Sequence, residues 1–200
     1  MGGRPRIVAA SQNAGKCREI ARILDFFEVL SLSEFAPVEF PEEGGDYFEN
    51  ARIKAQTAAR ATGLPCVADD SGLEVAFLKG RPGPYSARYG GPGLDDRGRV
   101  EFLLAELLDA PAPRRARFFC AAACAWPDGH SEVAEGVCEG EILFAPEGEG
   151  GFGYDPVFRA FGQARGMAQL DRAQKDALSH RGLAFRALAP LIHKGLSDFE

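Results

Sequence analysis

Two adjacent aspartates end an apolar run in the segment Pro65–Val75, which reads PCVADDSGLEV. Neighbouring side chains of an extended strand point to opposite faces, so Asp69 and Asp70 are not expected to share one pocket. We expect one carboxylate to point into a cleft, while backbone N–H groups or solvent hold the other. A carboxylate in a cleft can act as a general base or as a magnesium ligand. Taken alone, the pair is equally consistent with an Asx-type turn after a strand.

A second acidic pair, Glu42 and Glu43, lies on a loop rich in proline and glycine. Asn50 and Lys54 follow it, one turn apart on the flank of a predicted helix. Magnesium is usually held by one or two protein carboxylates together with water and substrate phosphate. Either glutamate, together with Asp70, would supply such a pair. By itself, the helix flank is better explained as a surface in contact with solvent.

A polar turn, SQNAGK at residues 11–16, joins a short apolar run to a predicted helix. The start of a helix offers free N–H groups and the positive end of the helix dipole, which suits phosphate. The turn is not a Walker A loop, because its leading glycine is absent and Cys17 replaces the Ser or Thr that would hold magnesium. Considered alone, it is more simply interpreted as a strand–helix turn with a surface lysine.

Two C-terminal segments add an aromatic ring and cationic side chains. In GFGYDP, residues 151–156, two glycines flank Phe152, which lets the backbone approach a ligand and the ring stack on a base. Ser179 is a predicted N-cap, which places His180 and Arg181 in the first turn of a helix. A cation is disfavoured there by about 0.5 kcal/mol. We interpret this unfavourable placement as a sign that the side chain meets a ligand.

No single cluster decides the function, but their combination is informative. Lys175 lies just upstream of the His-Arg pair and adds a further positive charge. Metal-binding carboxylates, scattered lysines, a glycine-rich aromatic turn and a His-Arg pair at a helix start together predict a site for phosphate and a base.

Apolar periodicity predicts the elements that position these clusters. Strands are predicted over residues 6–10 and 28–32, and a strand, a corner and a second strand over residues 66–70 and 73–77. Helices are predicted over residues 15–27, 46–62, 95–108 and 179–193. Residues 117–126 and 131–139 are typical of a β-hairpin that turns at PDGH. Because strands and helices alternate before the hairpin intervenes, we expect a mixed α/β sheet.

Composition and charge restrict the partners. A net charge of −6 without any basic run argues against nucleic acid or an anionic membrane as a partner. The five cysteines are an odd number without a C-x-x-C pair, which favours reduced, buried thiols. No signal-peptide pattern and no run near the roughly 20 apolar residues of a membrane span is present. We therefore expect a cytoplasmic protein.

The chain resembles the Ham1/inosine triphosphatase family, pyrophosphatases that hydrolyse non-standard purine nucleoside triphosphates to the monophosphate and pyrophosphate. Six segments in order over nearly the whole chain carry the resemblance: VAASQNAGK, EEGGDYFENARIKA, VADDSGLEV, GPYSARYGG, GFGYDPVF and KDALSHRG. It implies an elongated α/β fold with a long central mixed β-sheet flanked by helices. It also implies a single domain over residues 1–200, with two lobes, an active-site cleft between them and a homodimeric assembly.

The resemblance implies a role for each candidate residue. Asp70 would be the catalytic carboxylate, acting as general base and as a ligand of Mg²⁺. Glu42 would be the second metal ligand, by its distance from the Glu49–Asn50 pair, and Glu43 stands where threonine is common, so the choice between the two stays open. The substrate-binding residues would be Ser11, Asn13, Lys16, Lys54, Ser71, Phe152, Gly153, Tyr154, Asp155, Lys175, His180 and Arg181.

These roles imply hydrolysis of ITP, dITP or XTP, with nucleoside triphosphates as the partners. Cationic donors such as Arg181 or Lys175 can bond the 6-oxo group of these bases and reject the amine of adenosine. Two alternatives are a Maf-like pyrophosphatase of pyrimidine or modified nucleotides, and a nucleotide-sensing module without turnover. The pairing of FGYDP with SHRG argues against the first alternative. The combination of Lys16, Lys54, Asp70 and a nearby glutamate argues against the second.

Overall fold

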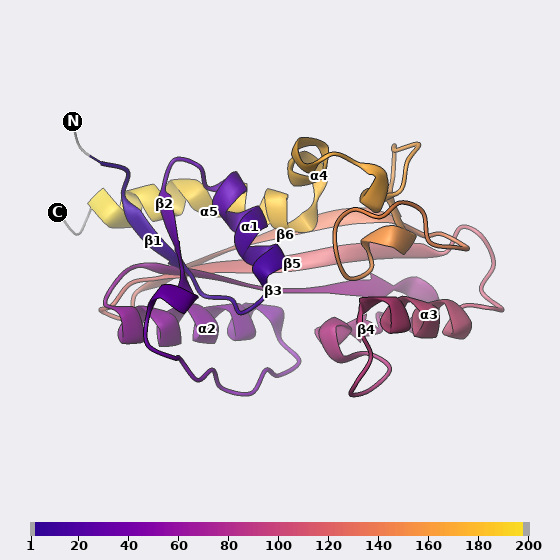
Figure 1. Cartoon of the computed structure of the whole chain (residues 1–200), viewed down its shortest axis with the longest axis horizontal. Helices are drawn as coiled ribbons and strands as arrows, with labels where there is room; N and C mark the ends of the chain where they lie inside the picture. Colours follow the sequence, from indigo (N-terminus) through magenta and orange to yellow (C-terminus); the bar gives the residue numbers. More distant parts are fainter. Residues whose placement is uncertain (1–2, 198–200) are drawn as a thin grey trace. The chain divides into compact units, whose positions relative to one another are not determined.

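A mixed β-sheet with helices packed against it makes up the fold (Figure 1). The structure is a computed structural model that describes residues 3–197. The strands are β1 (Arg6–Ala9), β2 (Glu28–Ser31), β3 (Cys66–Val75), β4 (Pro82–Gly83), β5 (Arg115–Ala125), β6 (Ser131–Ile142) and β7 (Phe158–Ala160). The α-helices are α1 (Ala14–Ile23), α2 (Tyr47–Thr62), α3 (Asp96–Glu106), α4 (Arg172–Leu178) and α5 (His180–Ser197).

Strand pairing confirms the predicted mixed sheet. Within residues 3–197 the order is β2-β1-β3-β5-β6-β7, with β4 paired to β3. Strand β1 runs parallel to both β2 and β3, whereas the pairs β3–β4 and β6–β7 are antiparallel. None of the helices in this part of the chain combines the length and the apolar character needed to cross a membrane.

The chain divides into two compact units. Unit 1 consists of the described parts of Met1–Asp70, Cys120–Gly136 and His180–Glu200, and unit 2 consists of Ser71–Phe119 and Val137–Ser179. Strands β3, β5 and β6 contribute residues to both units. Each unit has an apolar core of its own.

The core of unit 1 lies between the strands and the helices α1 and α5. Ile20 of α1 and Phe185 of α5 pack there with Ile7 of β1 and Val67 of β3. Helix α2 covers the opposite face of these strands (Figure 1) with a row of buried alanines. Small side chains at helical spacing let this helix pack closely on the sheet.

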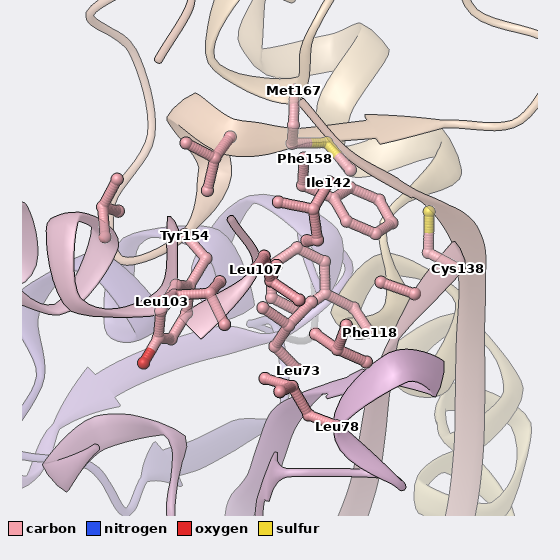
Figure 2. Packing of buried hydrophobic residues seen from close by; sticks show 14 of the residues in the cluster. Leu73, Leu78, Leu103, Leu107, Phe118, Cys138, Ile142, Tyr154, Phe158 and Met167 are labelled. Atoms are coloured by element: carbon pink, nitrogen blue, oxygen red, sulfur yellow. The ribbon is translucent and has the colours of Figure 1, made fainter. Parts of the chain in front are cut away.

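The core of unit 2 is richer in large side chains. Leu73 of β3, Leu103 of α3 and Phe158 of β7 are fully buried in one cluster with Phe118 and Ile142 (Figure 2). Burial of side chains of this size contributes about 1.5–3 kcal/mol each to folding. The cluster includes Tyr154, which belongs to the polar turn around Phe152.

Most predicted boundaries are confirmed, and the differences have physical causes. The strand–corner–strand prediction is wrong, because β3 continues unbroken from Cys66 to Val75. Helix α1 ends at Ile23 instead of the predicted residue 27, since the chain leaves the helix there and Phe27 is buried in the core. Helix α5 extends to Ser197, beyond the predicted 193. Three elements had no predicted counterpart: α4, β4 and β7.

Helix α2 illustrates why a start and a stop can be read from sequence. The carboxylate of Asp46 accepts hydrogen bonds from the N–H groups of Phe48 and Glu49, as an acidic N-cap does. Gly63 ends the helix with φ of 69°, a left-handed conformation that glycine adopts without strain. Both ends agree with the prediction.

Four of the five cysteines are buried, as expected. Burial raises the pKa of Cys66 to about 11 and that of Cys138 to about 12. Both groups therefore stay protonated thiols at neutral pH and behave as small apolar side chains.

The first turn of α5 packs very closely on β6 at Gly136. A Cβ atom there would lie 2.1 Å from the carbonyl oxygen of His180 and 2.5 Å from the backbone nitrogen of Ala184. Glycine therefore lets the segment that carries His180 and Arg181 rest against the sheet.

We predict that Gly136→Ala destabilises the protein by about 1–3 kcal/mol, because the added methyl group collides with helix backbone that cannot move aside. Urea unfolding measures the change. Gly3→Ala is the control, since nothing lies within 4 Å of a Cβ atom at that position. Equal stability of the two variants would show that α5 does not pack on β6 in this way.

Candidate active site

Strand β3 carries Asp69 and Asp70 in the interior of unit 1. Only 3% and 4% of their surfaces are exposed, respectively. Successive residues of a strand face opposite sides, and the partners of the two carboxylates indeed differ. The prediction that the two aspartates do not share a pocket is confirmed.

Cationic side chains surround Asp69, which the sequence interpretation did not foresee. Its Oδ2 atom accepts from Nη2 and Nε of Arg181, at 3.0 and 3.2 Å, and lies 3.0 Å from Nζ of Lys16. Arg181 also donates from Nη1 to Glu19 on α1, at 2.6 Å. Burial opposes ionisation of Asp69, but Arg181 and Lys16 hold the pKa of this carboxyl well below its usual range. Asp69 is therefore a permanent buried anion.

The surroundings of Asp70 are less favourable to charge. Its Oδ2 atom accepts from Nδ2 of Asn50 at 2.8 Å, and its Oδ1 atom lies 3.3 Å from Nζ of Lys54. Lys54 donates in turn to Glu43 at 2.8 Å. Burial raises the pKa of Asp70, outweighing the opposite effects of Lys54 and Asn50. A carboxylate with a raised pKa is a stronger base than an ordinary aspartate.

Asn50 fixes the acidic loop to Asp70. Its side-chain amide is bonded at both ends to Gly44, accepting from the N–H at 2.8 Å and donating to the carbonyl at 3.0 Å. The same amide group donates to Asp70. From the sequence, Asn50 was assigned only to the flank of a helix. Its position one turn before Lys54 was the signal that both side chains could meet the same partner.

The structure places Glu43, the alternative to Glu42, beside Lys54 and Asp70. The side chain of Glu43 is partly buried and bonded to Lys54, whereas Glu42 is exposed. Burial opposes the charge on Lys54, but the carboxylates of Asp70, Asp69 and Glu43 raise the pKa of this lysine. The ammonium of Lys54 thus lies between two carboxylates.

The carboxylate arrangement fits a hard cation. In residues 3–197 no three His, Cys, Asp or Glu side chains are grouped so that they alone could hold a metal. Magnesium needs only one or two protein carboxylates, since water and phosphate complete its coordination. Glu43 and Asp70 both form an ion pair with Lys54, and they are two carboxylates of the kind that magnesium needs.

Ion pairs link several cations and carboxylates in this part of unit 1. The cationic side chains in these pairs include Lys16, Lys54 and Arg181. The carboxylates include Glu19, Glu43, Asp69 and Asp70. A polyphosphate approaching these carboxylates would be repelled by them, and a divalent cation would offset that repulsion.

The predicted phosphate turn is the N-terminus of α1. The side chain of Asn13 caps the helix by accepting from the N–H of Lys16 at 3.1 Å, and Ser11 accepts from the N–H of Asn13 at 3.2 Å. A cavity of about 630 Å³ opens beside the turn and is lined in part by Ser11 and Gln12. The turn therefore combines a helix start with open space.

In unit 2 three predicted base-binding residues come together. The ammonium of Lys175 on α4 lies 2.5 Å from Oδ2 of Asp155 and 4.8 Å from the centre of the Phe152 ring. Asp155 also accepts from the N–H of Phe152 at 2.8 Å. A Cβ atom at Gly151 would lie 2.1 Å from the Asp155 carboxylate, so only glycine fits there.

The other predicted residues have the following positions. Gly153 donates from its N–H to Asp96, and the Tyr154 hydroxyl donates to the carbonyl of Ser86. Ser71 is partly buried on β3 in unit 2, and His180 is buried at the start of α5 in unit 1.

Sequence reasoning missed Glu19, Ser86 and Asp96. Glu19 lies three residues after Lys16 on the same helix, a spacing that places both side chains on one side. The side chain of Asp96 accepts from the N–H of Gly153, and the backbone carbonyl of Ser86 accepts from the Tyr154 hydroxyl. Both partners are distant in sequence, and no local pattern indicates them.

Replacement of the two aspartates is predicted to have different effects on stability. Asp69→Asn should lower the free energy of unfolding at pH 7 by about 3 kcal/mol or more, because buried Arg181 loses its main counter-ion. Asp70→Asn should leave it unchanged or raise it by up to about 1 kcal/mol, because one charge leaves a site rich in carboxylates. Urea unfolding of both variants measures this, and equal destabilisation would contradict it.

The effect of Asp69 should depend on pH. Its stabilisation is complete above the unfolded-state pKa of about 3.9 and declines as the pH falls below that value, because the unfolded chain binds the proton first. The stability difference between wild type and Asp69→Asn should therefore shrink from pH 7 to pH 3. A constant difference would contradict the low pKa.

Comparison with known proteins identifies the family of the chain. The model of the Ham1 family matches residues 7–191. A dITP/XTP pyrophosphatase of Streptomyces coelicolor is 44% identical, with 94% of this chain and 98% of the relative covered. One of Thermus thermophilus is 47% identical, with 95% and 93% covered.

Solved structures show the same relationship. A HAM1 protein from Coxiella burnetii has a TM-score of 0.83 at 40% identity, with 95% of this chain and 99% of that chain covered. A dITP/XTP pyrophosphatase from Mycobacterium abscessus has a TM-score of 0.72 at 44% identity, with 93% and 98% covered. The chain belongs to the Ham1 family.

Proposed function

We propose that the protein is a pyrophosphohydrolase that converts non-standard purine nucleoside triphosphates, namely dITP, XTP and ITP, to the monophosphate and pyrophosphate. Relatives that match nearly the full chain carry the name dITP/XTP pyrophosphatase. The observation that carries the proposal is the buried Asp70 with its raised pKa, bonded to Lys54 and Asn50. Asp70 is the general base of the proposal, and Lys54 beside it is a cation that can bind phosphate.

The triphosphate is bound by the residues around the start of α1 and by two lysines. Ser11, Asn13 and the free N–H groups of the helix start face an anion with the positive end of the helix dipole. Lys16 and Lys54 are held near this position by Asp69 and Asp70. Phosphate oxygens then compete with these carboxylates for the lysine ammonium groups.

Asp70 accepts the proton of the attacking water. The water oxygen forms a new bond to phosphorus as the anhydride P–O bond breaks, and the water proton passes to a carboxylate oxygen of Asp70. Lys16 and Lys54 stabilise the charge that develops on the departing pyrophosphate. Asn50 keeps Asp70 oriented through the 2.8 Å hydrogen bond.

Magnesium is the cofactor of this proposal. Asp70 and a glutamate of the loop, Glu43 or Glu42, would hold it. Bound there, the ion would neutralise phosphate charge and increase the acidity of water. The proximity of the Glu43 and Asp70 carboxylates, which both pair with Lys54, supports this requirement.

The base is recognised by the aromatic and cationic residues, as the resemblance implies. Phe152 offers a ring for stacking, and Lys175, fixed by Asp155, offers a donor to the 6-oxo group. A hydrogen-bonding site discriminates strongly against a base that lacks the partner atom. The remaining proposed base and substrate contacts are Ser71, Gly153, Tyr154, His180 and Arg181.

Four further properties belong to the proposal. The protein is a homodimer in the cytoplasm, it does not act on nucleic acid, and its 200 residues form a single domain with two lobes. Size-exclusion chromatography with light scattering tests the assembly.

A panel of nucleotides tests the function. Pyrophosphate release is measured with ITP, dITP, XTP, GTP and ATP, each with Mg²⁺ and with a chelator. We expect release from the first three, at least tenfold lower kcat/KM for ATP, and none with the chelator. Preference for a pyrimidine nucleotide would favour a Maf-like enzyme, and tight binding of ITP without release would favour a sensing module.

Asp70→Asn should lower kcat by about 10²–10⁴-fold, because the general base is lost. Unchanged unfolding stability is the control that the fold survives. Near wild-type turnover in this variant would remove Asp70 from the mechanism.

Glu42→Gln and Glu43→Gln identify the metal ligand. Isothermal titration with Mg²⁺ or Mn²⁺, without substrate, should show weaker metal binding in only one of them, by about tenfold or more. From the position of Glu43 next to Lys54, we expect Glu43→Gln to be that variant. Weakening only in Glu42→Gln would mean that the loop rearranges around the metal.

A further inference from the structure

The segment GPYSARYGG contains a buried serine that the proposed reaction does not use. Ser86 donates from Oγ to the carbonyl of Gly83 at 2.6 Å and accepts from the N–H of Leu73 at 2.8 Å. Leu73 lies on β3, two residues after Ser71, and is fully buried. Ser86 is therefore attached to the central strand by its side chain.

The backbone carbonyl of Ser86 holds Tyr154. The Tyr154 hydroxyl donates to it at 2.9 Å, and only 5% of the tyrosine is exposed. Figure 2 shows the Tyr154 ring within the apolar cluster of unit 2 and its oxygen at the margin of that cluster. Burial raises the pKa of Tyr154, so the phenol stays a hydrogen-bond donor.

Asp96, in the first turn of α3, holds the neighbouring residue. Its Oδ2 atom accepts from the N–H of Gly153 at 2.8 Å, and its Oδ1 atom lies 3.1 Å from Nη1 of Arg99. Gly153 has φ of 60°, a conformation that favours glycine. The hydrogen bond to Asp96 therefore stabilises a left-handed backbone conformation within the turn.

Three successive residues of the turn each form a hydrogen bond that holds them, one within the turn and two with other parts of unit 2. The N–H of Phe152 is bonded to Asp155 within the turn, the N–H of Gly153 to Asp96, and the hydroxyl of Tyr154 to Ser86. These bonds fix the backbone on both sides of the Phe152 ring. A stacking ring binds a base well only if its position is set before binding, since ordering it later lowers affinity.

We propose that Asp96 and Ser86 are positioning residues for base recognition, which hold the turn Gly151–Asp155 from α3 and from the GPYSARYGG segment so that Phe152 is preorganised for stacking. The inference rests on the proposed function, because it takes Phe152 as the ring that meets the base. Neither positioning residue needs to touch the nucleotide.

Asp96→Ala and Tyr154→Phe each remove one of the outer bonds, and Asp96→Ala is the deciding variant, because Tyr154 is itself one of the proposed base contacts. Loss of one hydrogen bond should raise KM for ITP about 5–10-fold, with kcat changed less than about twofold. Tripolyphosphate has no base, so its inhibition constant should stay the same in both variants. Asp96→Asn keeps an oxygen that can accept from Gly153, so it should restore most of the affinity for ITP.

The controls distinguish a loss of Phe152 positioning from general damage to the fold. Glu101→Gln breaks a comparable ion pair on α3, with Arg97 at 2.9 Å, and should leave all constants unchanged. A parallel rise in the tripolyphosphate constant, or an unchanged KM for ITP in Asp96→Ala and Tyr154→Phe, would overturn the inference while the proposed function stands. Absence of pyrophosphate release by the wild type would instead refute the proposed function, and the inference with it.

Discussion

The structure of unit 1 depends on the burial of two neighbouring carboxylates in one strand. Removing an anion from water is costly unless cations and hydrogen bonds replace the lost solvation. Arg181 and Lys16 supply that replacement at Oδ2 of Asp69, which stays ionised. Asp70 has it only in part, from Asn50 and one lysine, and its pKa rises. One carboxylate is therefore held ionised and the pKa of the next is raised, and the pleat of the strand separates them.

The surrounding elements are arranged to supply these partners. Helix α1 brings Lys16 and Glu19, α5 brings Arg181 in its first turn, and α2 brings Asn50 and Lys54. A cation at the start of α5 is unfavourable for the helix dipole, by about 0.5 kcal/mol. The carboxylates of Asp69 and Glu19 offset that cost. The unfavourable placement, interpreted from sequence as a sign of a substrate, thus has a buried counter-ion as one explanation.

In unit 2, hydrogen bonds hold the turn around Phe152, in addition to the ion pair of Asp155 with Lys175. The turn around Phe152 has glycines on both sides of the ring, and glycine-rich turns are mobile unless other groups hold them. Asp155, Asp96 and Ser86 hold its successive residues, and the apolar cluster beneath keeps Tyr154 in place. A site that recognises a flat base benefits from such rigidity, because less conformational freedom is lost on binding.

The sequence by itself determined both ends of α2, the mixed sheet and which residues could carry chemistry. The cap at Asp46 and the glycine at position 63 act within one turn of chain, so local pattern was sufficient to predict them. The motif residues around Phe152 and Asp70 were likewise visible from residue type and order. The tertiary structure decided which partners each aspartate has, that Glu43 approaches Lys54, and that Ser86 and Asp96 hold a distant turn. It also decided that β3 passes through two aspartates without a corner. Solvation of a charge depends on groups brought together from separate segments, and no local pattern records which of them will meet.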